Sequence, residues 1–276
     1  MTSNAQTGLD LRYGPGKLPA PETWSPIIDH LLTHRSVRRY RPDPVSDAQL
    51  SAIVAAAQSA ATSSNLHAWS VVAVRDPAKR AALSECSGNQ AHVRDAPLVL
   101  VWLADLARLA HVAEGVERPH GALDYLEMFI IGAVDAALAA QNGLAAAQSL
   151  GLSGCYIGGM RNQPERVAEL LELPPRVFAV FGMTLGVEDD SQGTAAIKPR
   201  MPQAAVLHQE RYRPLAEQEA AIEDYNRSMA AFYESQQMNV NGTWAVHSAK
   251  RIAGPETLTG RDRLVEALRN LGFELK

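Results

Sequence analysis

The sequence predicts an α/β or α+β fold of three layers, with helices on both faces of one central sheet. Apolar runs of strand length at 68–75, 97–105 and 177–187 are separated by helical patterns, which favours this class. The chain has 276 residues, of which 46% are hydrophobic, so it is long enough to bury a substantial core. The sequence contains no internal repeat, so a solenoid or a propeller is not expected.

The first 23 residues are polar and rich in glycine and proline. This composition predicts an irregular N-terminal arm, followed by a single domain over residues 24–276. A short apolar segment, 24–32, leads into the basic stretch HRSVRRYRPDP at 34–44.

A helix is expected to begin after Ser46, because Ser46 and Gln49 have the spacing of a capping box. The alanine-rich run then continues to residue 61, where the cluster Thr62–Asn65 ends it. A buried strand at 68–75 follows.

The middle of the chain alternates between helices and strands. A short helix with proline in its first turn is expected at 76–86, a second strand at 97–105 and a long helix at 122–150. The long helix is apolar around most of its circumference, so it packs either within a large core or partly against another subunit.

The last third of the chain begins with a glycine-rich turn at 151–159. A short helix follows Asn162 and ends before Pro174, and the third predicted strand spans 177–187. A loop around 198–200 leads to a helical region at 214–235 and to a tail helix at about 260–270.

The charge balance excludes several classes of protein. Lys and Arg number 26 and Asp and Glu 30, for a formal charge of −4. General binding to nucleic acid or to an anionic membrane requires a basic chain, so any anion site must be local. No stretch reaches ~18 uninterrupted apolar residues, and the N-terminus lacks a signal-peptide pattern, so we expect a soluble cytoplasmic protein. The two cysteines, Cys86 and Cys155, suggest neither a disulfide framework nor a zinc site.

Three short stretches could carry chemistry. In the first, an extended backbone would point His34, Ser36 and Arg38 to one side, a set suited to phosphate because the guanidinium matches phosphate oxygens. The second is Cys155–Gly159, where paired glycines allow close approach to a flat ligand. The third is Ile197–Pro202, a basic loop stiffened by two prolines. Taken alone, each also fits a plain reading: a basic surface turn, a tight turn and a solvated loop.

Other chemistry has no support in the sequence. The eight histidines show no metal-ligand spacing, so no metal site is expected. No GxSxG elbow or GxGxxG fingerprint is present. The polar residues at loop positions 63–65 and 90 are unremarkable when each is taken alone.

Taken together and in order, these stretches resemble the FMN-dependent nitroreductase family, in its branch of flavin reductases and oxygen-insensitive major nitroreductases. The matching segments are HRSVRRY, TSSNLHAWSVVAV, SGNQAHV, the run from VDAALAAQ to CYIGGMRN, LLELPPRVFAVFGMTLG and KPRMP. The resemblance covers nearly everything from Trp24 onward.

The resemblance implies an α+β fold with a central mixed sheet flanked by helices, in an intertwined homodimer that binds FMN at its interface. His34, Ser36 and Arg38, assisted by Arg35, would line the phosphate and the flavin edge. Ser63, Ser64 and Asn65 would come from the partner subunit, and Gln90 would meet the polar edge of the ring. The backbone of Tyr156, Ile157, Gly158 and Gly159 would run beside the ring, and Lys198 and Arg200 would supply further positive charge.

The implied reaction needs no catalytic side chain, because flavin N5 carries hydride transfer. NADPH or NADH would reduce the flavin, and a small aromatic acceptor (a nitroaromatic, a quinone or a free flavin) would then take two electrons in a ping-pong cycle. Cations beside the flavin would bind the phosphate and stabilise the negative charge that reduction adds.

One departure bears on the electron donor. NADPH-preferring members of the family carry arginines just before a C-terminal Thr-Trp pair, whereas here Met238–Gly242 contains no cation before Thr243 and Trp244. NADH as the donor is therefore a second possibility. Two alternatives stay open: a superfamily FMN enzyme with another reaction (a dehalogenase, an azole oxidase or an ene reductase), and a flavin-binding protein without turnover.

Overall fold

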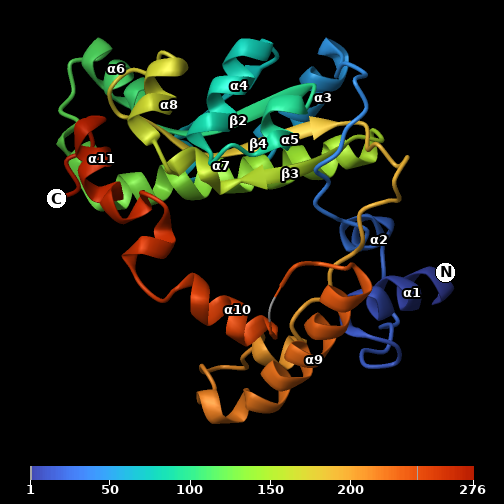
Figure 1. Ribbon diagram of the computed structural model, residues 1–276. Helices are drawn as coiled ribbons and strands as arrows, with labels where there is room; N and C mark the ends of the chain where they lie inside the picture. The colour runs from blue at the N-terminus through green and yellow to red at the C-terminus, as the bar shows by residue number, and fades with distance from the viewer. Residues whose placement is uncertain (1, 241) are drawn as a thin grey trace. The chain divides into compact units, whose positions relative to one another are not determined.

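The computed structural model describes residues 2–240 and 242–276, and the chain forms two compact units (Figure 1). The first, which we call the helical unit, comprises Met1–Arg35 and Ala195–Thr257. The second, the sheet unit, comprises Ser36–Thr194 and Leu258–Lys276.

The sheet unit is built on four strands in the order β1-β2-β4-β3, and each neighbouring pair is antiparallel. Their bounds are β1 (Trp69–Val74), β2 (Leu98–Asp105), β3 (Ser153–Ile157) and β4 (Val177–Gly186). Outside these strands, an isolated parallel bridge joins Ser36 to Gly154 of β3. The described sheet itself is antiparallel throughout, so the mixed sheet that the resemblance implied is wrong, because Ser36 adds a single bridge and not a strand. The α+β class predicted from the sequence is confirmed.

Alternation along β2 creates the three layers. Leu98, Leu100 and Trp102 face one cluster of buried side chains, which α3 (Asp47–Gln58) and α7 (Leu126–Ser149) complete. Val99, Val101 and Leu103 face a second cluster on the opposite side. That cluster is completed by α4 (Pro77–Cys86), α5 (Ala91–Asp95) and α8 (Pro164–Leu170). Helices therefore cover both faces of the sheet (Figure 1).

The predicted helix starts are confirmed where capping residues mark them. Ser46 and Gln49 form both hydrogen bonds of the capping box that opens α3. Asp76 accepts from the Lys79 N–H at 2.7 Å and opens α4. The long helix α7 begins at Leu126 rather than 122, because residues 121–124 form a separate 3-10 turn.

The predicted glycine-rich turn at 151–159 is wrong, because most of this stretch is strand β3. Gly154 serves packing rather than a turn: a Cβ there would lie 2.9 Å from Leu144 Cδ1 and 2.9 Å from Leu185 Cδ2. Glycine thus lets β3 approach the core closely, and the sheet has one strand more than the three expected.

The helix α7 is the one described helix long and apolar enough to span a membrane. Ala136, Ala140 and Leu144 are buried against the sheet, as in a core helix. Two shorter helices complete the sheet unit, α6 (Ala107–Gly115) and α11 (Leu264–Asn270), and the tail helix thus begins four residues later than predicted.

The helical unit contains α1 (Thr2–Tyr13), α2 (Pro26–Leu32), α9 (Glu219–Ser235) and α10 (Trp244–Arg251). The expectation of an irregular arm is therefore wrong for residues 2–13. Ala5 and Leu9 are buried, and Gly8 brings α1 close enough to α2 that a Cβ would lie 3.1 Å from Leu32 Cδ1. Packing against α2 offsets the weak helix propensity of this glycine-containing segment.

Candidate functional site

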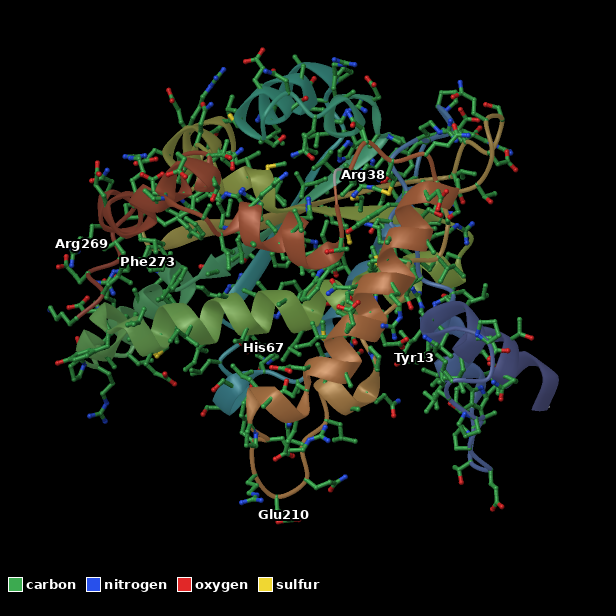
Figure 2. All side chains as sticks on the ribbon, turned by 60° about the horizontal axis from the view of Figure 1, so that its bottom comes forward. Tyr13, Arg38, His67, Glu210, Arg269 and Phe273 are labelled. Carbon is green, nitrogen blue, oxygen red and sulfur yellow. The ribbon has the colours of Figure 1, made fainter. Side chains whose placement is uncertain are left out.

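The segment Ser36–Arg38 lies along strand β3. Ser36 forms the parallel bridge with Gly154, and the Val37 N–H donates to the Gly154 carbonyl at 3.1 Å. Tyr40 fixes the segment further, since its hydroxyl donates to the Val37 carbonyl at 2.6 Å and shares a hydrogen bond of 2.7 Å with Thr184 Oγ1. Burial raises the pKa of Tyr40, so the hydroxyl keeps its proton and remains a donor. Arg38 is exposed, and its position can be followed in Figure 2.

Gln90 and Gly159 are in contact. The Gln90 side chain donates to the Ser87 carbonyl at 2.7 Å, and a Cβ at position 159 would lie 2.7 Å from that carbonyl oxygen and 2.8 Å from Gln90 Nε2. Real Cβ atoms do not approach so closely, so only glycine fits at position 159. The structure thus brings two residues of separate predicted motifs together.

His92 links this contact to Arg38. His92 lies in α5, two residues after Gln90, and its Nε2 atom is buried without a hydrogen-bond partner among the described residues. Burial lowers the pKa of His92, and the positive charge of Arg38 lowers it further. Arg38, Gln90 and the end of β3 therefore belong to one neighbourhood of the sheet unit.

Two cations that the sequence reading did not assign lie beside Gly158. A Cβ at this position would be 3.3 Å from Arg161 Nη2 and 3.8 Å from Arg261 Nη1. Burial, together with the charge of Arg261, lowers the pKa of Arg161. Arg161 follows the Gly158–Gly159 pair closely in the sequence, which is a signal that could have found it, whereas Arg261 lies more than a hundred residues after this pair.

Tyr156 and Ile157 contribute differently. The Ile157 side chain is buried in the core, so only its backbone is available to a ligand. Tyr156 packs edge-on against Phe181, and its hydroxyl donates to Gln141 Oε1 at 3.4 Å. Burial raises the pKa of the Tyr156 phenol.

Ser63, Ser64 and Asn65 are not brought to this neighbourhood within the chain. They form a 3-10 turn before β1, with φ of 48° at Ser64 and 56° at Asn65. The Ser63 N–H is held by the buried carboxylate of Asp135 at 3.1 Å. Since β1 and β3 are opposite edges of the sheet, three strand spacings separate them, or roughly 14 Å.

The remaining predicted cations belong to the helical unit, where Arg12 of α1 connects them. Arg12 Nη1 donates to the Lys198 carbonyl at 2.9 Å, and Nη2 donates to the His34 carbonyl at 2.5 Å. In return, the Arg200 N–H donates to the Arg12 carbonyl at 2.6 Å. The structure thereby brings the stretch His34–Arg35 and the loop Lys198–Arg200 together.

Arg12 is only 3% exposed, although it carries a guanidinium. Burial and the positive charge of Arg200 lower its pKa to about 10. The sequence reading missed Arg12, because it lies in the segment expected to be irregular. The result is a basic cluster in the helical unit, a setting that favours an anionic ligand. No group of metal-ligating side chains occurs in the part of the chain that the structure describes.

Comparison with known proteins identifies the family. Residues 31–187 match the nitroreductase family, and residues 198–276 match the C-terminal domain of the same family. The chain belongs to the nitroreductase family.

Similar nitroreductase-family proteins are known from sequence and from structure. The oxygen-insensitive NADPH nitroreductase of Salmonella typhimurium is 41% identical over 83% of this chain and 91% of its own length. The NADPH-flavin oxidoreductase of Vibrio harveyi is 39% identical over 82% of this chain and 91% of its own. The structure of NfrA2 from B. megaterium superposes with a TM-score of 0.85 at 35% identity, covering 92% of this chain and all of that one.

Proposed function

We propose that this nitroreductase-family protein is an FMN-dependent oxidoreductase. It uses NADPH or NADH to reduce nitroaromatics, quinones or free flavins by a ping-pong two-electron mechanism. Family membership supports this function, as do relatives named NADPH nitroreductase, NADPH-flavin oxidoreductase and FMN reductase. The observation that carries it lies along β3 and at its end: Ser36 and Val37 pair with Gly154 of β3, and Gly159, just beyond β3, packs against Gln90.

The residues present suit FMN. At Gly159, close packing on Gln90 fixes the backbone, and the half-buried Gly158 lies beside Arg161 and Arg261. These groups can donate hydrogen bonds to the polar edge of a flat ring and attract negative charge. The cluster around Arg12 offers positive charge for a phosphate. When bound, FMN supplies the redox chemistry, so no acid, base or nucleophile of the chain is required.

The individual residues divide these tasks. His34, Arg35, Ser36, Arg38, Lys198 and Arg200 hold the phosphate and flank the flavin. Gln90 and the backbone of Tyr156–Gly159 orient the ring. Ser63, Ser64 and Asn65 act on the cofactor of the partner subunit in a homodimer, an arrangement that their distance from β3 within one chain supports. The protein acts in the cytoplasm.

Flavin content and turnover test this function directly. The purified protein should be yellow, release FMN on denaturation, and lose its flavin absorbance anaerobically when NADPH or NADH is added. A protein that binds no FMN would overturn the proposal, and one that binds FMN but is reduced by neither nucleotide would favour another reaction of the superfamily.

Substitutions test the proposed phosphate contacts. Arg38→Ala and Arg200→Ala should weaken FMN retention during dialysis while leaving the protein folded. Arg41→Ala is a matched control, because Arg41 lies in the same basic stretch but forms an exposed ion pair with Asp190 at 2.8 Å. Unchanged flavin content in both test variants would contradict the assignment.

The electron donor can be shifted at the segment before α10. Thr243 caps this helix, and the described residues before it, 238–240 and 242, carry no cation. We expect Asn239→Arg to raise the ratio of kcat/KM for NADPH to that for NADH by about tenfold, since a charge-assisted contact to the 2′-phosphate contributes about 1.4 kcal/mol. Asn239→Gln is the neutral control. An unchanged ratio in the arginine variant would place the 2′-phosphate elsewhere.

A further inference from the structure

We propose that Arg12 is a positioning residue for phosphate recognition, acting through the carbonyl groups of His34 and Lys198. This inference rests on the proposed FMN function. It gives helix α1 a role in cofactor binding, although α1 lies outside the stretches that carry the family resemblance.

The geometry shows what Arg12 holds. One guanidinium donates to two backbone carbonyls, at 2.9 Å to Lys198 and 2.5 Å to His34, which are 164 residues apart in the chain. The backbone of Arg12 also accepts from the Arg200 N–H at 2.6 Å. Three contacts therefore fix the distance between the His34 segment and the loop that carries Lys198 and Arg200.

The electrostatics indicate an anion near this cluster. Among the described residues Arg12 has no carboxylate partner. The charged side chain with the largest effect on the pKa of Arg12 is another cation, Arg200. A buried cation without a counter-charge lowers stability, and the carbonyl dipoles offset this cost only in part. A phosphate dianion would offset the rest, so the cluster is better suited to the ligand-bound state than to the free protein.

A purely structural role predicts a different pattern. If Arg12 only anchored α1, its loss would weaken the binding of any flavin equally, through general loosening of the helical unit. If Arg12 sets the spacing of phosphate-binding segments, its loss weakens FMN far more than riboflavin, which has the same ring without the phosphate.

The experiment compares the dissociation constants of FMN and riboflavin for the flavin-depleted full-length protein, by quenching of flavin fluorescence. We expect Arg12→Gln to raise the Kd of FMN at least about tenfold, equivalent to about 1.4 kcal/mol, with little change for riboflavin. Arg12→Lys keeps the charge but loses the planar fork, so it should fall between wild type and Arg12→Gln. This second variant also tests the idea if the first does not fold.

Gln6→Ala is the matched control. Gln6 anchors α1 locally, accepting from the Ala20 N–H at 2.9 Å and donating to Asp10 Oδ1 at 2.7 Å, without touching His34 or Lys198. It should leave the ratio of the two dissociation constants unchanged. Equal losses for FMN and riboflavin in the Arg12 variants, or no loss for either, would overturn the inference. A wild-type protein that binds no FMN would instead overturn the proposed function itself.

Discussion

Asp135 is a buried carboxylate in the middle of α7, only 1% exposed, that faces backbone rather than a cation. Its two oxygens accept from the Ser63 N–H at 3.1 Å and from the Ala68 N–H at 3.2 Å. One buried side chain therefore holds the loop between α3 and β1, in which three residues, Ser64, Asn65 and His67, have a left-handed backbone.

Replacing Asp135 should destabilise the protein. In Asp135→Asn, an NH2 group takes the place of one acceptor oxygen and the negative charge is lost. We therefore expect the free energy of unfolding in urea to fall by about 2 kcal/mol. Asn142→Ala on the same helix removes only an exposed bond to the Ala56 carbonyl and should change it by less than about 0.5 kcal/mol. A similar loss in both variants would mean that Asp135 has no special role.

His92 should make stability depend on pH. Burial, assisted by the charge of Arg38, lowers the folded-state pKa of His92 below its ordinary 6.5. The unfolded state then binds more protons between the two pKa values, so the stability contribution is complete above about 6.5 and declines as pH falls below it. His92→Gln should flatten this part of the unfolding free energy profile between pH 5 and 7. A profile identical to wild type would contradict the assignment.

Single residues differ in how far the sequence reveals them. Ser46 and Gln49 could be predicted because both partners lie within one helical turn. Lys198 and His34 could be proposed as site residues through the family resemblance, but nothing local indicated what joins them. Arg12 has no such signal, since its partners are backbone carbonyls that any residue could supply.

The elements show the same dependence on distant partners. Strand β2 was predictable because all eight of its residues are buried and the first seven, Leu98–Ala104, are apolar. Strand β3 was not predictable. Its residue Gly154 allows close packing on Leu144 and Leu185, but in the sequence a glycine at this position suggests a turn. Helix α1 is stabilised by contacts with α2 that its own composition does not encode.

One face of α7 remains exposed. Ile130, Val134 and Leu138, spaced four residues apart, are 46%, 49% and 45% exposed. An apolar stripe of this kind on a helix that otherwise packs on the sheet suits a subunit interface.

Charging this stripe should dissociate the proposed homodimer. We expect Val134→Glu to halve the mass measured by light scattering and to reduce flavin content, because Ser63–Asn65 then no longer reach a partner. Val112→Glu on α6 provides a control, since Val112 is 56% exposed but outside the stripe. A dimeric Val134→Glu protein would place the interface on another surface.

For the whole molecule, the separation of β1 from β3 has a consequence for mixtures of two defective proteins. If each FMN site takes Arg38 from one subunit and Ser64 from the other, Arg38→Ala and Ser64→Asp damage opposite halves of a site. Aspartate tolerates the left-handed backbone at position 64 and adds a repelling charge.

Unfolding and refolding these two variants together should therefore restore activity that neither has alone. Random pairing makes half of the dimers mixed, and each mixed dimer contains one site with neither substitution, so about a quarter of the wild-type sites return. No recovery would show that both residues serve the same half of the site. The order of four strands thus predicts genetic complementation: two inactive alleles of this protein, expressed together, would yield a working enzyme.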